Sequence, residues 1–283
     1  MRIALIADIH ANLPALEAAL AAIRKHAPDA IYSLGDQINL GPCPGETLSL
    51  LRENGVVCLH GNHEGYVLGA MAGDERFQGA NFESLRFNAA RLSAQEITFP
   101  KELRTEGIVF CHSMPGDDRF PINEPKKALP RLREMRSEKP LHIVCGHGHN
   151  PTYYRLPNLT VDSIGSVGCM DDGVPGVTNF AILDAEGGVS AIKPYCAAYD
   201  TRPLWGLFKE SGMAQRCPVM ARLICCQMER NHDFLLEFLA VALPIADARG
   251  EEHVSLETWA QADARFAWPD GLTTADFWKG ARR

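Results

Sequence analysis

The chain begins with an apolar run that leads directly into polar residues: residues 2–12 read RIALIADIHAN. A short run of aliphatic side chains predicts a buried β-strand over residues 2–7. Asp8 and His10 follow at the carboxyl end of this strand. Loops at the carboxyl ends of parallel strands build functional sites. The stretch therefore predicts the first strand of a sheet and the first part of a site.

Four similar runs follow, and helical patterns separate the first three strands. Residues 14–26 place Leu16, Leu20 and Ile23 on one face, which predicts an amphipathic helix. Residues 46–53 predict a second helix. Alternation of strands and helices indicates parallel strands joined by right-handed crossovers. The further strands are expected at residues 30–34, 56–59, 108–111 and 141–145.

The expected fold class is α/β, with two packed mixed β-sheets flanked by helices and a helical C-terminal appendage. Turn residues separate four later strands, which we expect to form an antiparallel second sheet. These strands are expected at residues 153–156, 160–163, 179–184 and 189–194.

The composition changes near residue 199 and suggests two parts. Residues 1–199 are expected to form the main domain, with a helical insertion at 65–107 beside the site. Two helices are predicted in this insertion, at residues 82–92 and 94–103. Residues 200–283 are expected to form a mainly helical appendage with a helix at 222–243. All four tryptophans lie in this appendage: Trp205, Trp259, Trp268 and Trp278.

Each predicted parallel strand is followed by an Asp, Asn or His. Because parallel strands end at the same edge, these side chains are expected to lie together. Their oxygens and imidazole nitrogens fit Mn²⁺, Fe, Zn or Ni better than Ca²⁺. A carboxylate has two oxygens and can bridge two ions about 3.5–4 Å apart. The candidate ligands are Asp8, His10, Asp36, Asn62, His112, His147 and His149, and His63 is the candidate catalytic residue.

These residues stand in five ordered blocks: Asp8-Ile9-His10, Gly35-Asp36, Gly61-Asn62-His63-Glu64, His112, and Gly146-His147-Gly148-His149. The set resembles the calcineurin-like metallophosphoesterase superfamily. The opening block with Ala11 and Asn12 is similar to the DxHxN form of that family. The Gly-Ser-Val-Gly turn at 165–168 resembles its small bacterial phosphodiesterase-like branch. The resemblance covers about residues 1–200.

The resemblance implies a two-sheet sandwich that holds two divalent or transition metal ions, with manganese expected ahead of iron, zinc or nickel. It implies that Asp36 bridges the two ions and that His63 acts on the phosphate as a proton donor or electrostatic clamp. By the same resemblance, the first ion is held by Asp8, His10 and His149, and the second by Asn62, His112 and His147.

Two departures from the family pattern bear on the substrate. Protein Ser/Thr phosphatases of the superfamily carry a further Asp and Arg where this chain has Asn39 and Leu40, which disfavours a phosphoprotein substrate. The bacterial branch commonly has Gln-Pro-Arg after the Gly-Ser-Val-Gly turn. This chain has Cys169-Met170-Asp171 there, so a substrate-facing cation is missing from that position.

The charge balance excludes some partners. With 28 Lys and Arg against 35 Asp and Glu, the formal charge is −7. Long nucleic acid is disfavoured because its phosphates need clustered basic side chains. No apolar stretch reaches the roughly 20 residues of a membrane span, and no signal peptide is expected. The nine cysteines are read as reduced thiols of a cytoplasmic protein.

The function expected from these features is metal-dependent hydrolysis of a phosphomonoester or phosphodiester, on a small molecule or nucleotide. A dinucleoside polyphosphate hydrolase and a nuclease remain open alternatives. A scaffold on the same fold is the non-enzymatic alternative, although the full ligand set counts against it. The appendage is expected to pack on the main domain or on a second copy, which would make a homo-oligomer.

Overall fold

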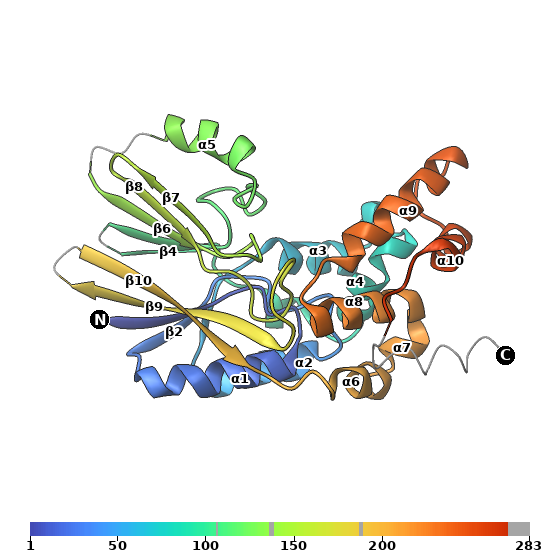
Figure 1. Cartoon of the computed structure of the whole chain (residues 1–283), viewed down its shortest axis with the longest axis horizontal. Coiled ribbons are helices and arrows are strands. Elements are labelled where there is room, and N and C mark those ends of the chain that lie inside the picture. The colour runs from blue at the N-terminus through green and yellow to red at the C-terminus, as the bar shows by residue number, and fades with distance from the viewer. Residues whose placement is uncertain (106, 136–138, 187–188, 271–283) are drawn as a thin grey trace.

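Two five-stranded sheets pack face to face, with helices outside and to one side (Figure 1). The computed structural model describes residues 1–105, 107–135, 139–186 and 189–270. The first sheet has the order β10-β9-β1-β2-β3. Its strands are β1 (Arg2–Ile6), β2 (Ala30–Ser33), β3 (Val57–Cys58), β9 (Val177–Glu186) and β10 (Val189–Ala198).

The second sheet has the order β4-β5-β6-β8-β7. In each sheet three strands are parallel, and antiparallel strands complete it. The two mixed sheets and flanking helices confirm the expected fold class. The strands of the second sheet are β4 (Glu102–Thr105), β5 (Ile108–Cys111), β6 (Leu141–Cys145), β7 (Thr152–Leu156) and β8 (Leu159–Ser163).

The predicted division of strands between the sheets is wrong. We expected all four late strands in one antiparallel sheet, but β9 and β10 join β1, whereas β7 and β8 join β6. The core between the sheets explains why the pattern misleads. Leu5 of β1, Phe110 of β5 and Val144 of β6 share one apolar cluster. An apolar run shows that a strand is buried, but it does not say on which side of the core the strand lies.

Helix α1 (Leu13–Ile23) begins where the sequence predicts, although it ends in a 3-10 turn over Arg24–His26. The side chain of Asn12 caps it by accepting a hydrogen bond from the N–H of Ala15 at 3.3 Å. Helix α2 (Pro44–Glu53) follows β2, as expected. Apolar residues of α1 cover the outer face of the first sheet, where Leu16 and Leu20 are buried.

One predicted helix in the insertion is wrong. The segment predicted at 94–103 is a 3-10 turn, Ala94–Ile97, followed by β4. Ser93 and Glu96 form the capping box of a helix start, but Pro100 disfavours helical backbone just before it. The helix predicted at 82–92 is present as α4 (Glu83–Ala89). Two helices were not expected: α3 (Asn62–Met71) and α5 (Pro125–Glu134).

The C-terminal region is helical, but the single helix predicted at 222–243 is divided into two. Asn231 has left-handed backbone, with φ of 49°, which ends the first helix. Asp233 then caps the second by accepting from the N–H of Leu236 at 2.9 Å. The helices of this region are α6 (Leu204–Glu210), α7 (Met213–Arg216), α8 (Pro218–Arg230), α9 (Phe234–Ala248) and α10 (Leu256–Arg265).

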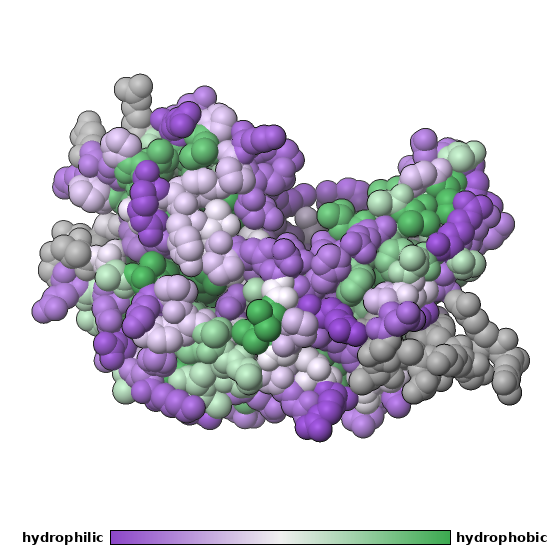
Figure 2. All heavy atoms as spheres, in the orientation of Figure 1, coloured by the Kyte–Doolittle hydropathy of each residue, from purple (hydrophilic) through white to green (hydrophobic). Residues whose placement is uncertain are grey.

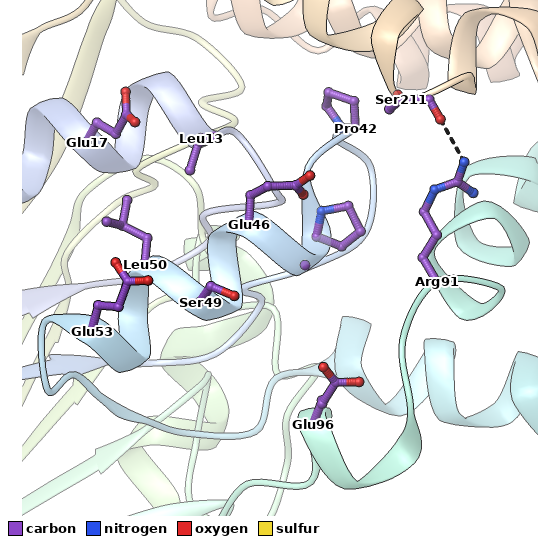
Figure 3. Close-up of a pocket in the computed structure, with 12 residues that line it drawn as sticks. Leu13, Glu17, Pro42, Glu46, Ser49, Leu50, Glu53, Arg91, Glu96 and Ser211 are labelled. Atoms are coloured by element: carbon purple, nitrogen blue, oxygen red, sulfur yellow. Dashed lines mark hydrogen bonds between the residues drawn. The ribbon is translucent and has the colours of Figure 1, made fainter.

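These helices pack on the rest of the chain. Trp205, Phe208 and Trp259 are buried in one cluster that also contains Phe87 and Cys169 from the first part of the chain. Arg91 donates a hydrogen bond of 2.7 Å to the carbonyl of Ser211, between α6 and α7 (Figure 3). Two aromatic residues that we expected to pack here, Phe277 and Trp278, lie outside the described residues.

The surface has a notch between the lobe that carries α5 and the lobe formed by α9 and α10 (Figure 2). On α9, Leu236 is 65% exposed and Leu243 is 50% exposed. Within the part of the chain that the structure describes, no helix combines the length and the apolar character needed to cross a bilayer.

Candidate metal centre

The eight candidate residues come from five places in the sequence and meet at one edge of the two sheets. Asp8 and His10 follow β1, Asp36 follows β2, and Asn62 and His63 open α3. Three histidines arrive from the second sheet: His112 after β5, and His147 and His149 after β6. Imidazole and carboxylate atoms of these residues form three overlapping groups, Asp8/His10/His149, His10/Asp36/His63 and Asp36/His112/His147.

The backbone at this edge is unusual. Five of the candidates have left-handed backbone, with φ between 49° and 62°. This conformation is uncommon for residues other than glycine, and it concentrates at functional sites. The tight loops let residues two positions apart, such as Asp8 and His10, direct their side chains to the same edge of the sheets. The five residues are Asp8, His10, Asp36, His147 and His149.

The first group has buried polar atoms without a partner. His10 Nε2 lies 3.1 Å from His149 Nε2, and Asp8 Oδ1 lies 3.9 Å from the same nitrogen. Asp8 Oδ1 and His10 Nδ1 are buried and accept or donate no hydrogen bond. Unpaired buried polar atoms are destabilising, so this group fits a cation that the carboxylate and the imidazoles would coordinate.

The second group surrounds His112. Its Nε2 lies 2.8 Å from Asn62 Oδ1 and 3.3 Å from Asp36 Oδ2. Its Nδ1 donates to the carbonyl of Leu34 at 2.9 Å, which directs Nε2 toward the other candidates. Gly35 has φ of +105°, and a Cβ there would lie 2.5 Å from His112 Nδ1. Glycine at this position therefore makes room for the His112 ring.

His63 lies at the same point but is bonded differently. Its Nε2 lies 3.9 Å from Asp36 Oδ2. Its Nδ1 accepts a hydrogen bond of 2.8 Å from the side-chain amide of Asn39. An imidazole that accepts through Nδ1 carries its proton on Nε2. This arrangement suits a hydrogen-bond donor to the phosphate better than a metal ligand.

Burial and neighbouring charges shift the pKa values of the candidates in opposite directions. Burial raises the pKa of Asp8 to about 6 and lowers the pKa of His147 to about 3. Burial disfavours the charged form of His112, but the carboxylates of Asp36 and Asp8 and the hydrogen bond to Leu34 together outweigh it and raise the pKa of His112 to about 10. Such divergent shifts in one cluster are typical of functional sites.

Comparison with known proteins agrees with this geometry. The sequence model of the calcineurin-like phosphoesterase family matches residues 1–175. The chain belongs to the calcineurin-like phosphoesterases. Its membership and its three Asp/His groups support metal-dependent hydrolysis of phosphoesters as the class of activity.

Individual relatives of this phosphoesterase cover different shares of it. An uncharacterized protein of Methanocaldococcus jannaschii is 42% identical over 113 residues, which is 40% of this chain and 42% of the relative. The match thus spans less than half of the length of that curated relative. It supports no transfer of a whole-protein activity.

Two solved structures show the fold. A metallophosphoesterase from Sphaerobacter thermophilus has a TM-score of 0.59 at 22% identity, and the match covers 78% of this chain and 99% of that one. A hypothetical protein from Pyrococcus horikoshii has a TM-score of 0.60 at 17% identity, covering 79% of this chain and 97% of the other.

Sequence reasoning missed several residues that support the calcineurin-like site. The carboxylate of Glu64 accepts from the N–H groups of Asp36 and Gln37, both at 2.9 Å, and of Gly61 at 2.8 Å. This buried side chain holds the two loops that carry Asp36 and Asn62. The spacing of Gly61 and Glu64 at the start of α3 is a capping-box signal that predicts part of this role. Asn39 was noted only as a departure from the phosphatase pattern.

Two cavities differ in their suitability for a phosphorylated substrate. One of about 680 Å³ is lined by four glutamates, Glu17, Glu46, Glu53 and Glu96, beside Arg91 (Figure 3). It contains none of the candidate ligands, and its charge disfavours an anion. The other, of about 350 Å³, borders His112. Its lining has two cations, Lys101 and Arg119, and two carboxylates, Asp117 and Asp118. Neither cation was singled out from the sequence.

Proposed function

We propose that this chain hydrolyses a small phosphorylated molecule, monoester or diester, with two metal ions bound at the candidate centre. Manganese is the proposed metal, ahead of iron, zinc or nickel. Asp36 is the proposed bridging ligand and His63 the proposed catalytic residue. Asp8, His10 and His149 would hold the first ion, and Asn62, His112 and His147 the second.

The observation that carries this proposal is the position of the Asp36 carboxylate. It is 1% exposed, and its Oδ2 lies 3.3 Å from His112 Nε2 and 4.0 Å from His10 Nε2. These two histidines belong to the two proposed ligand sets. The contact of one carboxylate with both sets supports Asp36 as the proposed bridging ligand.

When bound, a metal pair supplies Lewis-acid stabilisation of the charge that develops on the phosphoryl oxygens. The residues of the chain supply position and a hydrogen-bond donor. Asp36 Oδ1 accepts from the N–H of His63 at 2.8 Å, so the carboxylate and the imidazole are held together. The N–H at His63 Nε2 is directed into the centre, where it would donate a hydrogen bond to a phosphoryl or leaving-group oxygen and stabilise the charge that develops there.

The cavity beside His112 places one cation, Arg119, near His63. Arg119 lies 5.2 Å from the ring centroid of Tyr66, and Tyr66 packs against His63 with their centroids 5.3 Å apart. Arg119 is thus held near His63. It also lies 3.6 Å from Asp118, so it would contact an anionic part of a substrate by exchanging that carboxylate for it.

Further proposals concern the substrate class, the location and the oligomeric state. Substrates of the dinucleoside polyphosphate or nucleic-acid type are alternatives for the same chemistry. A scaffold role is the alternative without catalysis, and the presence of His63 with the full set of candidate ligands argues against it. We also propose a cytoplasmic location, supported by nine free cysteines, and homo-oligomer formation through the C-terminal region, supported by exposed Leu236 and Leu243.

The test is a substrate screen with metal-reconstituted protein. Mono- and diesters of p-nitrophenol, nucleoside phosphates, dinucleoside polyphosphates and single-stranded oligonucleotides would be compared with Mn²⁺, Zn²⁺, Ni²⁺ and Fe²⁺. We expect turnover of small esters that Asp36→Asn abolishes. Arg119→Ala should raise KM more for substrates that carry a second phosphate group than for p-nitrophenyl phosphate. Absence of turnover with every metal would favour the scaffold alternative.

A further inference from the structure

The loop between the Gly-Ser-Val-Gly turn and β9 reaches the candidate metal centre through Asp171. His149 Nδ1 donates to Asp171 Oδ1 at 2.7 Å. The other ring nitrogen of His149 is the one that faces Asp8 and His10. A carboxylate on the outer nitrogen of an imidazole sets its tautomer and its orientation. Asp171 therefore lies where it can hold His149 in position.

The C-terminal region fixes the loop that carries Asp171. The side-chain amide of Asn231, in the turn between α8 and α9, donates to the carbonyls of Val174 at 2.7 Å and Val177 at 2.8 Å. The backbone carbonyl of Asn231 accepts a hydrogen bond from the N–H of Gly173 at 2.8 Å. Asn231 itself is 2% exposed, so its side chain is enclosed by the loop that it holds.

A further bond in the same turn reaches Asp171 itself. The N–H of Asp233 donates to the backbone carbonyl of Asp171 at 3.0 Å. The four bonds of the turn thus hold the loop from Asp171 to Val177 along its length.

The start of the loop, at Gly168, is linked to helix α8. Asn12 donates to the carbonyl of Gly168 at 2.8 Å, and its amide lies 3.4 Å from the hydroxyl of Tyr199. That hydroxyl donates to the carbonyl of Met228, near the end of α8, at 2.8 Å. The last turn of α8 is therefore linked to the loop before Asp171 through Tyr199 and Asn12, and the Asn231 turn contacts the loop after it.

We propose that Asp171 is a positioning residue for His149, and that the Asn231 turn of the C-terminal region holds Asp171 in place. Residues beyond 199 would then help to position a metal ligand, in addition to burying apolar side chains of the first part of the chain. The inference rests on the proposed function in that His149 is taken as a metal ligand. Partners in this position typically change metal affinity by about 10–100-fold when they are removed.

The test compares two variants with two matched controls. Asp171→Ala removes the acceptor, and Asp172→Asn alters the exposed neighbouring carboxylate. Asn231→Gly removes the side-chain amide but tolerates the left-handed backbone. Asn158→Gly does the same at another left-handed asparagine, between β7 and β8. Asp171→Asn is the conservative variant, because its amide oxygen still accepts a hydrogen bond.

The first readout needs no metal. In the metal-free chain, ¹⁵N-resolved NMR reports which nitrogen of His149 carries a proton and how fast that proton exchanges. We expect a protected Nδ1 proton in the wild type and both controls, loss of protection in Asp171→Ala, and faster exchange in Asn231→Gly. Unchanged His149 resonances in Asp171→Ala or in Asn231→Gly would overturn the inference.

The second readout is metal affinity, measured by competition with a chelator. We expect Asp171→Ala and Asn231→Gly to weaken binding by roughly 10–100-fold, Asp171→Asn to restore part of it, and the controls to match the wild type. Equal affinity in all five variants would contradict the positioning role. A wild type that binds no metal would instead overturn the proposed function, and the NMR result alone would then decide whether Asp171 and Asn231 orient His149.

Discussion

At the scale of single residues, the site depends on backbone that most side chains avoid. Asp8, His10 and Asp36 have left-handed φ values between 51° and 56°. Each costs of order 1–2 kcal/mol relative to the right-handed region. The buried hydrogen bonds that Glu64 accepts from the N–H groups of Asp36 and Gln37 offset part of this cost. The loops therefore exist in this form because the site requires their side chains to converge.

The most informative single substitution is His63→Ala. We expect the metals to remain bound, because the hydrogen bond from Asn39 to Nδ1 leaves His63 with an N–H at Nε2, which cannot coordinate a metal. Turnover should fall by about 10²–10³-fold, the usual cost of removing one hydrogen-bond donor to the developing charge. The loss should be smaller with a very good leaving group. His253→Ala, at an exposed position outside the site, serves as the control. Wild-type turnover in a fully metallated His63→Ala protein would disprove the assigned role.

At the scale of elements, the C-terminal helices depend on capping interactions that also respond to pH. The carboxylate of Glu251 accepts from the N–H of Ser255 at 2.9 Å and from the hydroxyl of Thr258 at 2.8 Å. These bonds hold the start of α10, where Trp259 packs on Phe238 of α9. The backbone bond from Ser255 is the largest cause that lowers the pKa of Glu251, to about 2.

The depressed pKa predicts how α10 stability changes with acid. A carboxyl whose pKa is lower in the folded chain stabilises it fully above the unfolded pKa, and this is lost as the pH falls toward the folded value. Glu251→Gln should therefore be less stable than the wild type at pH 7. The difference should stay nearly constant down to the unfolded pKa of 4.5 and should narrow as the pH falls from there toward 2. Denaturant midpoints followed by tryptophan fluorescence measure it. A difference that widens with acid would refute the assignment.

The sequence predicted which polar side chains lie together better than it predicted how the strands divide between the sheets. The candidate residues were found because each directly follows an apolar strand, and that spacing is local in sequence. The pairing of β9 with β1 joins residues such as Leu183 and Ile3, and no local pattern encodes a contact of that separation. Asp171 was likewise noted only as a departure, because its contact with His149 depends on a loop held by Asn231.

At the scale of the whole molecule, we propose a phosphoesterase domain at residues 1–199, with an insertion at 65–107. We also propose that removing the C-terminal region lowers the stability of this domain. The shared cluster of Phe208, Trp259 and Phe87 motivates this division. Truncation after Asp200 should expose Phe87, Leu40 and Cys169 to water. We expect aggregation or a clearly lower midpoint of thermal unfolding.

Gel filtration with light scattering and a thermal melt would measure the outcome of truncation. The full-length chain is the reference for oligomeric state. A soluble, monodisperse and fully active truncated chain with the same oligomeric state would show that residues beyond 200 are an independent appendage.

The measurement that tests the central claim most directly is the number of metal ions per chain. Elemental analysis of protein equilibrated with saturating Mn²⁺ and then freed of unbound metal should give two ions per chain, and anomalous scattering should place them about 3.5–4 Å apart on either side of Asp36. Asp36→Asn should lose occupancy at both positions, because it weakens the carboxylate that both would share. One ion per chain or none, in a folded wild-type protein, would contradict the account.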